Sequence, residues 1–225
     1  MESMTGGPAD YSGASARSLR GWSLCAALGS TRYSRPCIAE KKSWLKYLMT
    51  QPRYTGTARA LHWLAALLIF CGFGLGLFMT GLEITPDKLR YYGWHKWLGI
   101  TVFLLAAARL AWRAGHPAPP PPAIMPAWQI RASRGAHTML YVLMLAIPVS
   151  GWIYSSATGV SVVYLGLVPL PDLVPKDREA AKTLLLLHQS LNSLLAFVVS
   201  VHIAAALKHH FVDRDDVLVR MLPGR

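Results

Sequence analysis

The sequence predicts an all-α integral membrane protein, a bundle of four helices. The chain of 225 residues is 53% hydrophobic and only 15% charged, with a mean hydropathy of +0.32, a composition typical of membrane proteins. Four apolar runs each reach about 20 residues, the length at which a helix crosses about 30 Å of hydrocarbon. Backbone polar groups in lipid must be hydrogen-bonded within the protein, which favours helices for these runs.

The four runs are expected to form helices over about 57–82, 91–112, 135–157 and 183–211. The second connection contains "HPAPPPPAIMPAW", which is too rich in proline to be helical. The third contains the alternating, Val-rich stretch "TGVSVVYLGLVPL", which predicts a short hairpin or lid over one membrane face. Trp and Tyr cluster near the ends of the runs, as they do at membrane interfaces.

The first 50 residues differ from the four-helix domain expected over 51–225. The segment "MTGGPADYSGASARSLRGWSLCAALGS" has no sustained apolar period, as is typical of a disordered tail. Its Arg- and Ser-rich, acid-poor composition also fits a transit-like or signal-like segment. Met49 offers an alternative start, which would make residues 1–48 a misassigned extension. We expect a disordered or misassigned extension without an essential role.

The formal net charge of +12 is distributed unevenly along the chain. Basic residues precede the first run, surround the Pro-rich connection and follow the fourth run, whereas the other two connections mix basic with acidic residues. Around the Pro-rich connection stand Arg109, Arg113, Arg131 and Arg134. This bias places both termini and the Pro-rich connection in the cytoplasm. The basic residues form no basic helix or aromatic–basic module, so nucleic acid is not an expected partner.

Two histidines, His188 and His202, lie 14 residues apart in the fourth run. Fourteen residues rotate an α-helix by about 1400° and rise about 21 Å, so both imidazoles lie on nearly one face at two depths. In the expected orientation, His95 in the second run matches the outer depth of His188. His62 in the first run matches the inner depth of His202.

These matched depths suggest haem. Neutral imidazole is a common axial ligand of haem iron, and ionisable residues inside a membrane are usually functional. The pattern therefore predicts two bis-histidine sites for b-type haem, stacked across the membrane. Covalent attachment is excluded because the sequence has no Cys-x-x-Cys-His motif.

Alternatives to this ligand set stay open. His137 in the third run shares the inner depth with the first and fourth runs' inner histidines, and only two of the three can ligate one iron. A single histidine in an apolar helix also commonly forms a hydrogen bond between helices. Zinc is less favoured, because it would need three or four donors at one depth.

Four segments resemble the bacterial cytochrome b561 family from about Met49 to the C-terminus: "RYTGTARALHWLAALLIF", "GWHKWLGI", "LLLHQSLN" and "SVHIAAALKHHFVDRDDVLVRML". Within that family, the resemblance is to four-helix, di-haem members that transfer electrons from superoxide to ubiquinone. It implies a bacterial inner-membrane enzyme with two non-covalent b haems. It also implies a particular set of axial ligands, namely His62, His95, His188 and His202, and places His137 outside that set.

The substrate sites are less well specified by the sequence. Superoxide is a small anion, so its capture would benefit from positive charge near the outer haem. The candidates for this role are Lys96, Arg90, Arg178 and Lys182. Quinone carbonyls need hydrogen-bond donors near a haem edge, and the third run offers His137, Ser150, Trp152, Ser155 and Ser156.

Two other functions compete with the enzyme. Related di-haem subunits of hydrogenases and formate dehydrogenases pass electrons for a catalytic partner, so an electron-transfer anchor is the main alternative. A proton-coupled transporter using intramembrane histidines is the other, and four helices without an internal repeat argue against it. The partners expected of a stand-alone enzyme are superoxide, ubiquinone and the lipid bilayer, without a protein partner.

Overall fold

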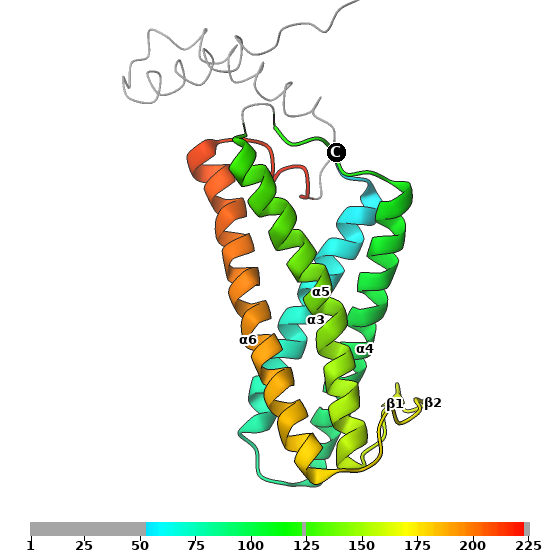
Figure 1. Ribbon diagram of the computed structural model, residues 1–225. Coiled ribbons are helices and arrows are strands. Elements are labelled where there is room, and N and C mark those ends of the chain that lie inside the picture. The colour runs from blue at the N-terminus through cyan, green and yellow to red at the C-terminus, as the bar shows by residue number, and fades with distance from the viewer. Residues whose placement is uncertain (1–52, 123–124, 223–225) are drawn as a thin grey trace, which may run out of the picture. The chain divides into compact units, whose positions relative to one another are not determined.

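Four long helices make up the computed structural model, which describes residues 53–122 and 125–222 (Figure 1). Each is long and apolar enough to cross a membrane, which confirms the predicted fold class. The predicted N-terminal extension lies outside the described residues. The helices are α3 (Gly56–Thr80), α4 (Pro86–Gly115), α5 (Ala127–Thr158) and α6 (Arg178–Lys208), which continues into the π-helical turn η2 (His209–Asp213).

Three helices begin earlier than the apolar runs predict, because their first turns are polar. The observed starts are 86, 127 and 178, against expected starts of about 91, 135 and 183. Before α4, the Oγ1 of Thr85 accepts from the N–H of Lys88 at 3.3 Å, and Pro86 suits the first helical turn. Before α6, a carboxylate oxygen of Asp177 accepts two backbone N–H groups at 2.9 and 3.1 Å. Hydropathy therefore finds the lipid-facing part of each helix, and side-chain caps set the true beginnings of α4 and α6.

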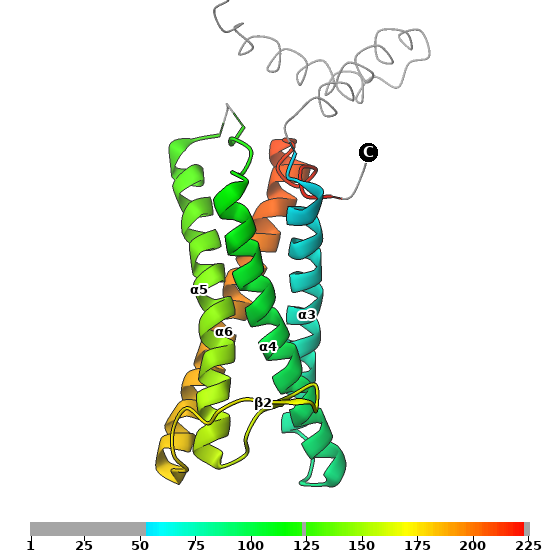
Figure 2. The same ribbon diagram turned by 90° about the vertical axis from the view of Figure 1, so that its right-hand side faces the viewer.

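Helices that are neighbours in the chain pack against one another: α3 on α4, α4 on α5 and α5 on α6 (Figures 1 and 2). Two clusters of buried side chains hold these contacts together. The first joins α3, α4 and α5, and the second joins α5 and α6. In the first, Ala65 and Ala106 are almost fully buried, and their small side chains let the helices approach closely. Large apolar side chains such as Phe70 and Phe197 point outward, at 57% and 66% exposure, as expected of a surface that faces lipid.

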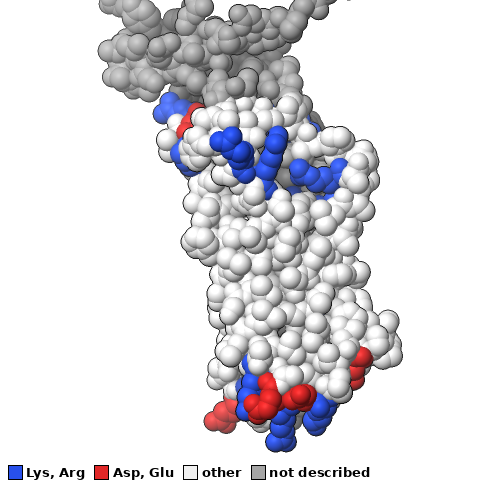
Figure 3. All heavy atoms as spheres, viewed as in Figure 1, with Lys and Arg blue, Asp and Glu red and all other residues white. Residues whose placement is uncertain are grey.

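Charged residues gather at the two ends of the bundle. On the face drawn in Figure 3, a broad belt without Lys, Arg, Asp or Glu separates them. We call the end that carries the connection from α4 to α5 the Pro-loop end, and the opposite end the hairpin end. Basic residues predominate at the Pro-loop end, and acidic and basic residues are mixed at the hairpin end. This distribution is typical of a membrane protein with one more positive side.

The short hairpin expected between α5 and α6 is present. Its strands, β1 (Val163–Tyr164) and β2 (Val168–Pro169), pair antiparallel. The turn between them places Leu165 and Gly166 at φ of 54° and 72°, a left-handed conformation that glycine adopts without steric cost. Trp97 of α4 donates its Nε1–H to the carbonyl of Val163 at 2.7 Å, which ties the hairpin to the flank of α4.

The C-terminal residues after η2 fold back onto the start of α3. Arg59 donates to the carbonyl of Leu222 at 2.9 Å, and the Nε1–H of Trp63 donates to the carbonyl of Met221 at 2.8 Å. The C-terminal segment thereby closes part of the Pro-loop end beside α3.

Candidate haem sites

Two pairs of histidines face each other across the bundle. The ring centres of His62 on α3 and His202 on α6 are 6.3 Å apart, with planes at 72°. Those of His95 on α4 and His188 on α6 are 6.4 Å apart, with planes at 83°. The structure thus brings together the same pairs that the depth argument matches.

These separations fit two imidazoles on opposite sides of one metal ion. A metal–imidazole nitrogen bond of about 2.0–2.1 Å, with the ring centre roughly 1.1 Å behind the nitrogen, puts two opposite ring centres about 6.3 Å apart. A direct hydrogen bond of about 2.9 Å between the two rings would instead bring their centres to about 5 Å. The residues present therefore fit axial ligation of haem iron better than a hydrogen bond between helices.

His137 is the third imidazole at the level of His62 and His202. Its ring centre is 5.2 Å from that of His202, which is too close for the opposite ligand of one iron. Its Nδ1–H donates to the carbonyl of Ser133 at 2.7 Å. The distances therefore favour His62 over His137 as the partner of His202.

The ring of His188 is oriented from α5. Its Nδ1 lies 3.1 Å from the carbonyl oxygen of Ile147 and 2.9 Å from the Oγ of Ser150. Because a carbonyl can only accept, the Nδ1 carries the hydrogen, and the Nε2 is left to bind a metal. Ser150, a predicted quinone donor, thus contacts a candidate haem ligand.

Glycines give two of the histidines their space. A Cβ at Gly151 of α5 would lie 3.0 Å from the Cε1 of His188, and one at Gly76 of α3 would lie 3.2 Å from the Cε1 of His95. Gly151 is a site residue that the sequence reasoning missed. Its only signal was a glycine within an apolar helix, and glycine is common in such helices.

The predicted superoxide-steering residues have different surroundings at the hairpin end. Arg90 is exposed and lies 3.6 Å from Asp87. Lys96 follows His95 in the chain, is half-buried, and donates its Nζ to the carbonyl of Val160 at 3.1 Å. Lys182 pairs with Glu179 at 2.7 Å, and both side chains are largely exposed. Arg178 is exposed in the first turn of α6.

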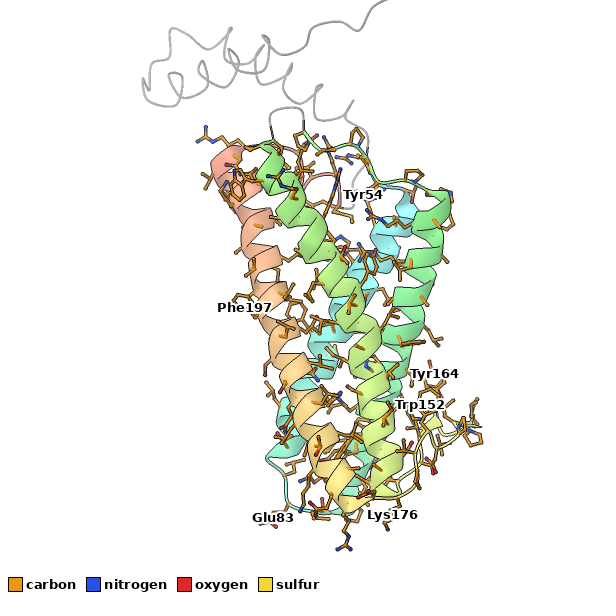
Figure 4. All side chains as sticks on the ribbon, viewed as in Figure 1. Tyr54, Glu83, Trp152, Tyr164, Lys176 and Phe197 are labelled. Carbon is orange, nitrogen blue, oxygen red and sulfur yellow. The ribbon has the colours of Figure 1, made fainter. Side chains whose placement is uncertain are left out.

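The remaining predicted quinone donors of α5 already have acceptors within the protein. The Nε1–H of Trp152 donates to the carbonyl of Pro171 at 3.0 Å. The hydroxyl of Ser155 donates to the carbonyl of Val160, and that of Ser156 to the carbonyl of Trp152. These groups hold the connection to the hairpin, on the side where Trp152 and Tyr164 are labelled in Figure 4.

A pocket at the Pro-loop end contains site residues that the sequence reasoning did not single out. Arg109 and Arg113 of α4 line it, together with Tyr54, Trp112 and Tyr141; Tyr54 marks this end in Figure 4. The available signal was an arginine inside an apolar run, which indicated only the orientation of the chain in the membrane.

Comparisons with known proteins agree with this architecture. A sequence model of the prokaryotic cytochrome b561 family matches residues 53–224. Cytochrome b561 homolog 2 of Escherichia coli (strain K12) is 33% identical over 186 residues, which cover 79% of this chain and 95% of that protein. Cytochrome b561 homolog 1 of the same organism is 31% identical over 180 residues, or 77% of this chain and 98% of that protein.

A third relative has a functional name. The probable superoxide oxidase CybB of Yersinia pestis is 27% identical over 178 residues, which cover 77% of this chain and 97% of that protein. The family match spans all four membrane helices and all the histidines that face one another across the bundle. This chain belongs to the prokaryotic cytochrome b561 family, bacterial membrane proteins of electron transport that carry b-type haem.

Proposed function

We propose that this protein is a di-haem superoxide:ubiquinone oxidoreductase. The proposal rests on the two histidine pairs, in each of which the ring centres are as far apart as in two axial ligands of one haem iron. The two couples share α6, on which their ligands lie 14 residues, or about 21 Å, apart. Such a spacing suits an electron path across most of the hydrocarbon layer. The relative named probable superoxide oxidase supports the choice of superoxide as donor.

Four histidines would ligate the two haems in this proposal. His62 and His202 would hold the haem of the Pro-loop end, and His95 and His188 that of the hairpin end. Haem supplies reversible one-electron chemistry, while the protein sets its position, orientation and electrostatic surroundings. The Ser150 hydroxyl and the Ile147 carbonyl would keep the Nε2 of His188 free of a proton and aimed at the iron.

The reaction balances as two superoxide anions, one ubiquinone and two protons giving two molecules of O₂ and one ubiquinol. Lys96 is the foremost candidate for attracting superoxide, because it stands next to His95. Arg178 would add positive charge at the same end, and Lys182 would add less because Glu179 pairs with it. Among the predicted quinone donors, Ser150 is engaged with His188 and Ile147, and Trp152, Ser155 and Ser156 hold the connection to the hairpin. His137 is the remaining candidate, with its ring centre 5.2 Å from that of His202, so we place ubiquinone reduction at its level.

The chain would be oriented in the bacterial inner membrane with the Pro-loop end in the cytoplasm. The predominance of basic residues at that end supports this orientation (Figure 3). The hairpin end would face the periplasm, where superoxide would be captured.

The test is an anaerobic, rapid-mixing experiment on the purified, oxidised protein with a short-chain ubiquinone. Added superoxide is expected to reduce the b-type haem on the timescale of rapid mixing, and the reduced haem is then expected to convert the ubiquinone to quinol. Absence of b-type bands in a reduced-minus-oxidised spectrum would refute the haem assignment. Intact b haem that superoxide leaves oxidised would favour the alternative, an electron-transfer anchor for a partner dehydrogenase or hydrogenase.

A further inference from the structure

An arginine lies inside the membrane-spanning part of α4, at the level of the Pro-loop-end histidines. Arg109 is six residues from the end of α4, and His62 is six residues from the start of the antiparallel α3, so both lie about 9 Å from the ends of their helices. Arg109 is within electrostatic range of His62, His137 and His202. A charged side chain at this depth is costly and usually functional.

Two guanidinium groups share the pocket at this end. Arg113 follows Arg109 by four residues, so the two lie on the same face of α4. The guanidinium of Arg109 lies 5.5 Å from the ring centre of Tyr141. The positive charges of the two arginines repel each other, and an anion between them would relieve that repulsion.

Protein carboxylates at the Pro-loop end are occupied elsewhere, as far as the structure describes this end. Its three described acids follow α6 and are paired with neighbours from the same segment. The carboxylate Oδ2 of Asp213 lies 2.6 Å from the Nζ of Lys208, and that of Asp215 lies 2.5 Å from the Nδ1 of His209. The Oδ2 of Asp216 lies 3.0 Å from the Nε of Arg220. None of the acids in residues 53–122 and 125–222 forms an ion pair with Arg109 or Arg113.

We infer that Arg109 and Arg113 bind the two propionate carboxylates of the haem held between His62 and His202. The inference rests on the haem assignment of the proposed function. Two guanidiniums match two carboxylates in charge, and the planar guanidinium fork suits bidentate binding of a carboxylate. Both arginines line one pocket, and Arg109 is also within electrostatic range of His62 and His202.

Charge at the two ends of the bundle also bears on the direction of electron flow. At the hairpin end, Arg90 is 3.6 Å from Asp87, and Lys182 pairs with Glu179, so acids offset part of the positive charge. Positive charge stabilises the reduced, more negative form of a haem, and local charge is one of the terms that set its reduction potential. Arg109 and Arg113 would therefore raise the potential of the Pro-loop-end haem and draw electrons from the hairpin end towards it.

The test is a potentiometric titration of the purified holoprotein with the haem content measured in parallel. In R109Q, and more strongly in R109Q/R113Q, one of the two midpoint potentials is expected to fall while the other stays in place. R109K is expected to retain most of the wild-type potential. The matched control is R131Q, which removes an exposed arginine of α5 at the same end and is expected to leave both potentials unchanged.

Haem dimethyl ester, in which both propionates are uncharged, tests the carboxylates themselves. Wild-type protein reconstituted with the ester is expected to lose the Pro-loop-end haem faster to an apoprotein acceptor, as R109Q/R113Q does with natural haem, and the ester is expected to accelerate this loss little further in R109Q/R113Q. If the double variant loses one haem and keeps the other, the arginines are needed to hold that haem, as the inference requires. The midpoint potential of the Pro-loop-end haem is then measured in R109K. Unchanged potentials in the double variant, or an equal fall in R131Q, would overturn it.

These outcomes separate the inference from the proposed function. Two b haems with the expected shift, in a protein that does not oxidise superoxide, would support the inference and refute the activity. A protein without b haem would refute both. If the same arginines bound a lipid headgroup instead, wild-type protein would lose the ester and natural haem at the same rate, and this would count against the inference.

Discussion

Ser150 and His188 share one acceptor. The Oγ of Ser150 donates to the carbonyl of Ile147 at 2.8 Å, and the Nδ1–H of His188 points at the same carbonyl, at 3.1 Å. The hydroxyl also lies 2.9 Å from the Nδ1. A turn of α5 thus sets the tautomer and orientation of a ring on α6, which is how partners of a ligand tune a metal site.

Ser150→Ala should therefore weaken haem binding at the hairpin end. Partners of a metal-ligating histidine typically contribute about 10–100-fold to affinity, and the carbonyl of Ile147 remains in the variant. We expect loss of one haem to an apoprotein acceptor to be about tenfold faster, with the other haem unaffected. Ser200→Ala is the control, because that hydroxyl is exposed and bonds only to its own helix, at the carbonyl of Ala196. Equal haem loss from the two variants would contradict the role of Ser150.

Gly151→Ala should displace the same ring by contact rather than by loss of a hydrogen bond. The added Cβ would lie 3.0 Å from the Cε1 of His188, whereas a Cβ at Gly74 would meet nothing within 4 Å. Gly151→Ala is expected to lose the hairpin-end haem, while Gly74→Ala keeps both. Haem per protein, measured from the pyridine haemochrome, checks this. Two haems in Gly151→Ala would show that the ring can shift without cost.

The four helices were predictable from the hydropathy of each run alone. The histidine pairs were predictable because the depth of each histidine follows from its position along its own helix. Hydropathy marks the lipid-facing stretch, and the spacing from His188 to His202 is a property of α6 alone. The polar first turns were missed, since hydropathy is silent about caps such as Thr85 and Asp177. The close approach of Gly151 to His188 and the position of Arg109 beside His62 depend on how helices rotate against one another. The weak periodicity of helices that are apolar nearly all round leaves that rotation undetermined.

The choice between His62 and His137 as the Pro-loop-end ligand can be decided by removing each in turn. The two candidates stand 6.3 and 5.2 Å from His202, measured between ring centres, and only the longer distance fits opposite ligands of one iron. His62→Ala is expected to retain one haem per protein, and His137→Ala to retain two. The reverse result would assign the ligand to His137 and make His62 the neighbour.

Lys96→Gln tests the capture of superoxide. If the ammonium attracts the anion, its removal should lower the rate of superoxide consumption several-fold at low ionic strength and flatten the dependence of that rate on salt. Because Lys96 also donates to the carbonyl of Val160, Lys96→Arg is needed as a variant that keeps the charge, and it should retain most of the rate. Lys182→Gln is the matched control, since that ammonium is already paired with Glu179, and a smaller effect is expected. An unchanged rate and salt slope in Lys96→Gln would mean that the ammonium only anchors the hairpin connection, and that superoxide reaches the hairpin end without its help.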